Sequence, residues 1–105
     1  MSDSIETNSA VCAIIYKAIR DSETKFSFAD YNMVQKMLSF YKDSCLEAKK
    51  DMNSLIVDIN AAQDVLQEFK ESDYTISEVK NIAKDNIDPS NVKMVEDMLK
   101  DEKTF

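Results

Sequence analysis

Residues 31–69 read YNMVQKMLSFYKDSCLEAKKDMNSLIVDINAAQDVLQEF, and apolar residues recur through this stretch at spacings that alternate between three and four. A 3.5-residue period of this kind is typical of a helix that presents one continuous seam to another helix. No charged residue interrupts the seam. Its successive a and d positions are Tyr31, Val34, Leu38, Tyr41, Cys45, Ala48, Met52, Leu55, Ile59, Ala62, Leu66 and Phe69.

The seam predicts one long helix over residues 28–71, with Ser27 as its N-cap, because nothing in this range demands a break. At about 1.5 Å per residue such a helix would extend roughly 65 Å, about twice the diameter of a compact globule of this size. The molecule is therefore expected to be elongated. The alternative is an interruption of the helix near residues 43–44 or 58–60.

Shorter helices are expected on both sides of this range. Asp3 and Glu6 have the spacing of a capping box, which predicts a helix over residues 4–20. The segment from Asp21 to Phe26 has poor periodicity and is interpreted as a connection.

The C-terminal third contains two more helix starts. Thr75 and Glu78 form a second possible capping box, which predicts a helix over residues 76–85. In Asp88-Pro89, aspartate is a favoured N-cap and proline suits the first helical position, so a last helix is predicted over residues 89–101.

Composition supports a wholly helical fold. The 105 residues include no glycine, no histidine, no tryptophan and a single proline, while 44% are hydrophobic. Glycine usually supplies tight turns and close backbone approach to phosphate, so its absence argues against both hairpins and nucleotide loops. The sequence therefore predicts a single all-α domain, an elongated helical bundle with one long central helix and three shorter helices.

The charge of the chain limits its partners. A formal net charge of −7 disfavours binding to nucleic acid or to an anionic membrane, because the net field repels polyanions. No stretch approaches the roughly 20 apolar residues of a membrane span, and the N-terminus lacks the basic region of a signal peptide. A cytoplasmic location is therefore expected.

Few residues suggest chemistry. Without histidine, Ser-His and Cys-His nucleophile pairs are excluded. Cys12 and Cys45 have no CxxC spacing and lie among apolar neighbours, so they are expected to be buried thiols. We predict no catalytic residue, no metal or cofactor site and no small-molecule substrate.

The seam has to be covered, because exposed a and d residues would leave the helix only marginally stable. The cover could be the short helices of the same chain, a second copy or another protein. The short helices could cover both ends of the seam, so we expect the intermolecular contact in its middle. The predicted interaction residues are Ala48, Met52, Leu55, Ile56, Val57, Ile59 and Ala62, although Ile56 and Val57 could equally be core.

The charges beside the seam do not select a partner. In a parallel pair of identical helices, the facing e and g positions form no ion pair. Antiparallel self-pairing, pairing with a different protein and an intramolecular bundle therefore all remain open.

These features predict a non-enzymatic protein-interaction, assembly or adaptor protein that docks through its long helix on a protein partner or a second copy. The alternative is an acidic regulatory inhibitor that binds a basic groove of a nucleic-acid-processing protein. Its acidic face would be formed by Asp51, Asp58, Asp64, Glu68 and Glu71.

Overall fold

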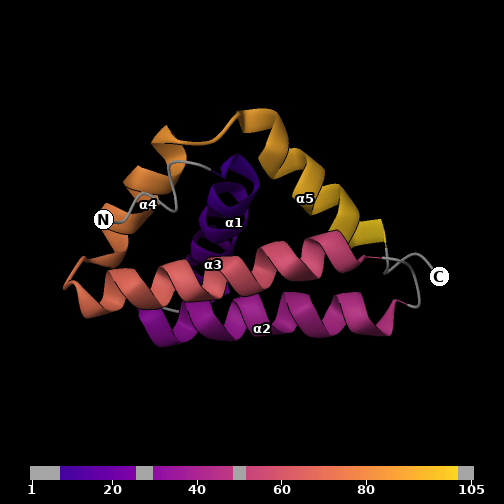
Figure 1. The fold of residues 1–105 in the computed structure, drawn as a ribbon, viewed down its shortest axis with the longest axis horizontal. Coiled ribbons are helices and arrows are strands. Elements are labelled where there is room, and N and C mark those ends of the chain that lie inside the picture. Colours follow the sequence, from indigo (N-terminus) through magenta and orange to yellow (C-terminus); the bar gives the residue numbers. More distant parts are fainter. Residues whose placement is uncertain (1–7, 26–29, 49–51, 102–105) are drawn as a thin grey trace.

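The computed structural model describes residues 8–25, 30–48 and 52–101. Within these ranges the chain forms five α-helices and no strand, so the predicted all-α class is confirmed (Figure 1). The helices are α1 (Ser9–Lys25), α2 (Tyr31–Glu47), α3 (Asn53–Glu71), α4 (Ile76–Asp85) and α5 (Pro89–Asp101).

Helix α1 lies at the centre of the bundle. It packs against all four other helices, and Figure 1 shows it inside the triangle formed by α4, α5 and the α2–α3 pair. The run from Val11 to Ile15 is fully or almost fully buried, and so are Ala18 and Ile19 further along. A helix that is apolar on nearly all sides has to be enclosed by other elements. The central helix is therefore α1 and does not belong to the range 28–71.

The range predicted as one long helix contains two helices in this structure. α2 and α3 lie side by side and run in opposite directions (Figure 1). The Gln35 Nε2 group donates to the Gln63 carbonyl oxygen at 3.3 Å, and the Gln63 Nε2 group donates to the Ser39 Oγ at 3.1 Å. The turn lies between Glu47 and Asn53, whereas residues 43–44 and 58–60 lie inside helices.

The predicted elongated shape is wrong for the same reason. The longest extent of the molecule is 40 Å and its radius of gyration is 12.9 Å, close to the value of about 13 Å for a compact chain of this length. Folding back allows both halves of the seam to bury their side chains in one molecule. Eleven of the twelve seam residues are buried, and Tyr31 is half-buried.

The start and end of α1 also differ from the prediction. The helix is capped by Asn8, whose Oδ1 atom accepts from the Val11 backbone N–H at 3.0 Å. Asp3 and Glu6, the predicted capping box, lie outside the described residues. The helix continues to Lys25, so most of the segment that the sequence predicts as a connection is helical, and Ser22 within it is buried.

The ends of α3 and α4 are defined by local signals. Thr75 and Glu78 form the reciprocal capping box, and α4 spans the range that the sequence predicts, as does α5. α3 ends in a Schellman motif, in which the backbone N–H groups of Asp73 and Tyr74 donate to the carbonyl oxygens of Lys70 and Phe69. Asp73 accordingly has a φ of +63°, a position where glycine is usual.

Candidate functional site

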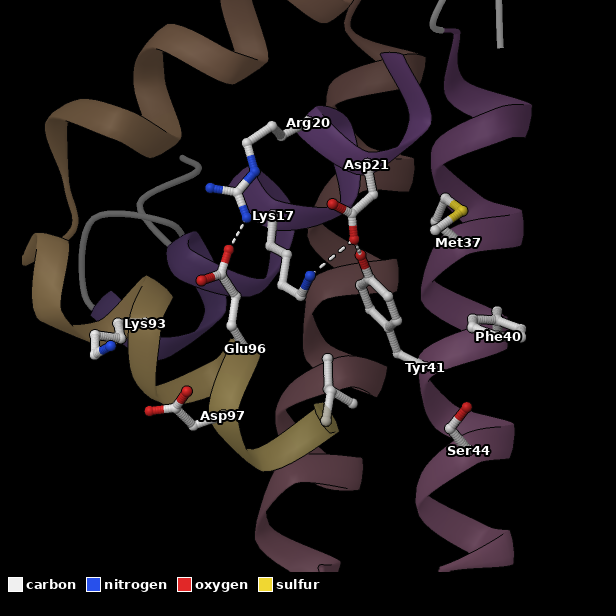
Figure 2. Close-up of a pocket in the computed structure, with 11 residues that line it drawn as sticks. Lys17, Arg20, Asp21, Met37, Phe40, Tyr41, Ser44, Lys93, Glu96 and Asp97 are labelled. Atoms are coloured by element: carbon white, nitrogen blue, oxygen red, sulfur yellow. Dashed lines mark hydrogen bonds and ion pairs between the residues drawn. The ribbon is translucent and has the colours of Figure 1, made fainter. Parts of the chain in front are cut away.

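A hollow of about 550 Å³ lies between α1, α2 and α5. Figure 2 shows charged side chains from α1 and α5 on one side of this hollow and Tyr41, Phe40 and Met37 of α2 on the other. Its lining residues are Lys17, Arg20, Asp21, Met37, Phe40, Tyr41, Ser44, Lys93, Glu96, Asp97 and Leu99.

The hollow forms where the polar side of α1 reaches the surface. The buried residues of α1 occupy most of the circumference of the helix, and Lys17, Arg20 and Asp21 occupy the remaining side. These three side chains are half-buried because α2 and α5 lie on either side of them. The central helix therefore supplies the polar floor of the hollow.

The Asp21 carboxylate joins α1 to α2. Its Oδ2 atom accepts hydrogen bonds from the Tyr41 hydroxyl and from the Lys17 Nζ group, the latter at 2.8 Å (Figure 2). The Lys17 Nζ atom also lies 5.3 Å from the centroid of the Tyr41 ring, within the range of a cation–π interaction. The three side chains therefore form one connected polar cluster.

The environment of Tyr41 favours its protonated form. Burial raises the pKa of the Tyr41 hydroxyl most strongly, the hydrogen bond to Asp21 and the charge of Asp21 raise it further, and Arg20 opposes the shift. At neutral pH this hydroxyl is therefore a hydrogen-bond donor to Asp21 and is poorly suited to act as a base. The cluster is better suited to holding α1 and α2 together than to proton transfer.

A second ion pair joins α1 to α5. The Arg20 guanidinium contacts the Glu96 carboxylate, and Lys93 and Asp97 lie on the same side of α5 with exposed side chains. The hollow is lined by three cationic and three anionic side chains, so its formal charge is zero, whereas the whole chain carries −7. The surroundings of the hollow are therefore much less acidic than the average surface.

Apolar side chains complete the hollow. Met37 and Leu99 are buried, whereas the Phe40 ring is 48% exposed and lies with its centroid 6.5 Å from that of Tyr41. Ser44 follows Phe40 by one helical turn on α2. Phe40 is thus an exposed aromatic side chain beside paired charges.

The predicted interaction residues lie elsewhere, and most of them are buried. Their stretch of the seam packs inside the molecule, so it is not available as a docking surface in this fold. Ile56 is half-buried and Val57 is 63% exposed. The buried members of the set are Ala48, Met52, Leu55, Ile59 and Ala62.

The predicted acidic face is present in part on α3. Asp64, Glu68 and Glu71 are exposed and follow the spacing of one helix face. Asp58 is half-buried, and burial raises the pKa of its carboxyl group. Asp51 lies outside the described residues. The acidic face therefore consists of three carboxylates along the C-terminal half of α3.

Cys12 and Cys45 are buried, as predicted, and no disulfide joins them. Burial raises the pKa of Cys12 from 9.0 to about 11, which lowers the reactivity of its thiol. Among the described residues, no group of three or more His, Cys, Asp or Glu side chains could hold a metal ion.

No helix in the described part of the chain combines the length and the apolar character needed to cross a membrane. Comparison of the chain with models of known protein families, with curated proteins and with solved structures finds no match.

The hollow has little signal in the sequence. The Lys17–Asp21 pair has the i, i+4 spacing of a helical ion pair, which was the available local signal. The Arg20–Glu96 contact joins residues 76 positions apart, and Tyr41 lies 20 positions from Asp21. Contacts at such separations follow from the arrangement of the helices and have no pattern in a single sequence.

Proposed function

We propose that the protein is a non-enzymatic protein-binding module whose docking surface is the hollow between α1, α2 and α5. The observation that carries the proposal is the exposed Phe40 ring beside the hollow. Aromatic side chains in partly formed pockets are the usual anchors of protein interfaces, since they bury a large area at a small cost in conformational entropy.

The charge of the hollow favours a protein ligand over a polyanion. Binding to phosphates requires cations that are available, but Lys17 and Arg20 are already engaged with Asp21 and Glu96. A site with no net charge on an acidic protein also repels an acidic partner less than the remaining surface does.

The partner proposed for this site is an amphipathic helix of a different protein. Its apolar side would contact Phe40 and the buried edges of Met37 and Leu99, in the manner of helix-in-groove recognition. Charged side chains flanking that apolar side would face Lys93 and Asp97, which are exposed on α5. Apart from Tyr41, which lines the hollow, the heptad seam would not take part in this interaction, because its residues are packed inside the molecule.

A photo-crosslinking amino acid at position 40 tests the proposal. The matched control carries the same group in place of Met94, which is 52% exposed on α5 but does not line the hollow. In the native host, we expect a discrete adduct with another protein from position 40 and none from position 94. An excess of the protein that carries Phe40→Ser, added as a competitor, should fail to suppress that adduct. Equal labelling from both positions, or no adduct at position 40, would contradict the proposal.

A second candidate function is inhibition through the acidic face of α3. Its support is the exposure of Asp64, Glu68 and Glu71 along one side of the helix. If these carboxylates imitate a nucleic-acid backbone, binding to a poly-arginine peptide should weaken steeply with salt. The double substitution Glu68→Gln and Glu71→Gln should abolish most of that salt dependence, whereas Glu78→Gln on α4 should leave it unchanged. A weak salt dependence in the unaltered protein would exclude this function.

A further inference from the structure

A regular register relates α2 to α3 across the hairpin. The Gln63 Nε2 group donates to the Ser39 Oγ at 3.1 Å, so Ser39 and Gln63 lie opposite each other. Because the two helices run in opposite directions (Figure 1), seven residues forward along α2 correspond to seven residues back along α3. Leu46 therefore lies opposite Ile56, at the end of the hairpin where α2 connects to α3.

The surface that carries these residues has no carboxylate. It consists of the residues that directly follow the twelve seam residues in the sequence, of which the structure describes all but Lys49. These eleven described residues, the outer face of the hairpin, comprise six amides, two lysines, one serine and two apolar residues. Seven are exposed and four are half-buried, whereas Met37 and Val65, on the other flank of the seam, are buried. The outer face is thus open to solvent and lacks Asp and Glu, although these make up 20 of the 105 residues.

The outer face is most apolar at the end beside the connection. Leu46 is 61% exposed, and Val57, which borders the face, is 63% exposed. No other large apolar side chain among the described residues is as exposed. Ile56, opposite Leu46, is half-buried. Exposed apolar side chains that gather on one surface usually mark an interaction site.

We infer that two copies of the chain associate through their outer faces, around a two-fold axis parallel to α2 and α3. Each α2 then lies antiparallel to α3 of the second copy, and the two hairpins form an antiparallel four-helix bundle. This symmetry places each residue of the outer face over the residue that lies opposite it in its own hairpin. Leu46 of each copy therefore packs on Ile56 of the other. The inference does not depend on the hollow or on its proposed partner.

The composition of the outer face favours a second copy as its partner. In the proposed dimer, Lys42 of one copy meets Asn60 of the other, and Gln35 meets Gln67, so no like charges face each other. An amide group both donates and accepts hydrogen bonds. Two identical amide-rich faces are therefore complementary to each other, as a two-fold contact requires.

The apolar residues select the direction of the axis. A two-fold axis perpendicular to the helices would place Leu46 over Asn32 of the second copy and Ile56 over Lys70, so that each apolar side chain would face a polar one. The parallel axis brings the apolar ends of both faces together. Burial of these side chains then stabilises the dimer.

Charge and area set the expected strength of the contact. Two copies that each carry a net charge of −7 repel each other, and contact through a face without carboxylates limits this repulsion. Two adjacent helices, each about 25 Å long and about 10 Å across, present roughly 500 Å² per copy. The total of about 1,000 Å² is at the lower limit of specific interfaces, so we expect a dissociation constant of about 1–100 μM.

Sedimentation equilibrium at chain concentrations from about 1 μM to about 1 mM tests the association. We expect a reversible equilibrium between monomer and dimer. Phe40→Ser changes the hollow and should leave the dissociation constant unchanged, because the outer face does not include Phe40. A monomer at every concentration, or a dimer that Phe40→Ser abolishes, would overturn the inference.

Two variants of equal charge locate the contact. Leu46→Glu/Gln67→Glu places carboxylates at exposed positions of the outer face and should raise the dissociation constant at least about a hundredfold. Asn81→Glu/Met94→Glu adds the same charge at exposed positions of α4 and α5 and should change the constant less than about threefold. Circular dichroism checks that both variants keep the helical fold. Equal constants in the two variants would show that the dimer uses another surface.

Cross-linking tests the direction of the axis. Gln35→Cys and Gln67→Cys are prepared as separate proteins and mixed with a short thiol-specific cross-linker, while the native Cys12 and Cys45 are buried. The mixture should give a covalent dimer that contains one copy of each variant. Each variant alone should give none, because identical positions lie on helices diagonally across the bundle. Cross-linked dimers of Gln35→Cys alone, or none from the mixture, would contradict the proposed symmetry.

Discussion

α1 and the α2–α3 hairpin bury their apolar residues in different ways. α1 is buried on most sides, and its Lys17, Arg20 and Asp21 side chains form the floor of the hollow. The two helices of the hairpin bury one side each and expose the other. A regular heptad thus identifies a helix that packs on one side, whereas a short unbroken apolar run, such as Val11 to Ile15, identifies the helix that the others enclose.

The largest difference between these regions should appear in core truncations. Ile14→Ala on α1 should lower the free energy of unfolding by about 3–4 kcal/mol, because the side chain is fully buried and leaves a cavity. Ile56→Ala on α3 removes the same atoms from a half-buried site and should cost about 1 kcal/mol. Urea denaturation followed by circular dichroism measures both. Equal losses would contradict the central position of α1.

The hydrogen bond that joins α1 to α2 should contribute less to the free energy of unfolding than the buried side chain of Ile14. Tyr41→Phe removes the hydrogen bond from the buried Tyr41 hydroxyl to Asp21 and should lower the free energy of unfolding by about 2 kcal/mol. The control is Tyr16→Phe on α1, a half-buried tyrosine that does not line the hollow. Denaturant unfolding at neutral pH checks the prediction, and a similar loss in both variants would contradict a specific role for this bond.

The same hydroxyl should make stability depend on pH in alkali. The folded-state pKa of Tyr41 is raised, so its contribution to stability is complete below the unfolded pKa of about 10 and is lost as pH rises above it, by up to about 1.4 kcal/mol per pH unit. Cys12 adds a smaller loss between pH 9.0 and about 11. Tyr41→Phe should flatten the profile above pH 10, as measured by thermal unfolding, and an unchanged slope would contradict the assignment.

The turn after α3 should accept a substitution that raises the free energy of unfolding. Asp73→Gly should raise the free energy of unfolding by about 1 kcal/mol, because glycine has no Cβ to clash at a positive φ. Ser72→Gly is the matched control, since Ser72 has a φ of −97° and gains nothing from the substitution. Differential scanning calorimetry should show a higher Tm for Asp73→Gly only. A lower Tm would mean that the Asp73 side chain stabilises the turn.

The smallest effect is expected where the C-terminal part of α1 meets α4. The Lys80 Nζ atom lies 3.1 Å from Glu23 Oε1, but both side chains are partly exposed to solvent. A double-mutant cycle with Lys80→Ala and Glu23→Gln should give a coupling free energy below about 0.5 kcal/mol. A coupling above 1 kcal/mol, which would be unusual for a solvated pair, would show that α4 depends on this contact.

Helices with strong local signals could be predicted from the sequence, but the way in which the helices pack against one another could not. The capping box of Thr75 and Glu78 and the Asp88-Pro89 pair indicate the starts of α4 and α5. The turn after Glu47 has no such signal, because the seam is equally regular on both sides of it. The chain reverses there since each half of the seam can then pack in one core, a property of the whole molecule.

Even less of the candidate site could be predicted from the sequence. Its lining comes from three helices, and its central contacts, Tyr41 with Asp21 and Arg20 with Glu96, depend on how α2 and α5 lie against α1. The surface that the sequence did suggest, around Leu55 and Ile59, is core. Apolar periodicity shows which side chains have to be buried, but it does not show whether the cover comes from the same molecule.

The position of α1 in the chain has a consequence for biosynthesis. Among the described helices, the one that the others enclose comes first in the chain, and part of its cover, including Val92, Val95 and Leu99, belongs to α5, which follows the other four. During synthesis, the apolar surface of α1 is therefore incompletely covered until α5 has left the ribosome. During that interval the nascent protein is a natural substrate for chaperones that recognise apolar helices.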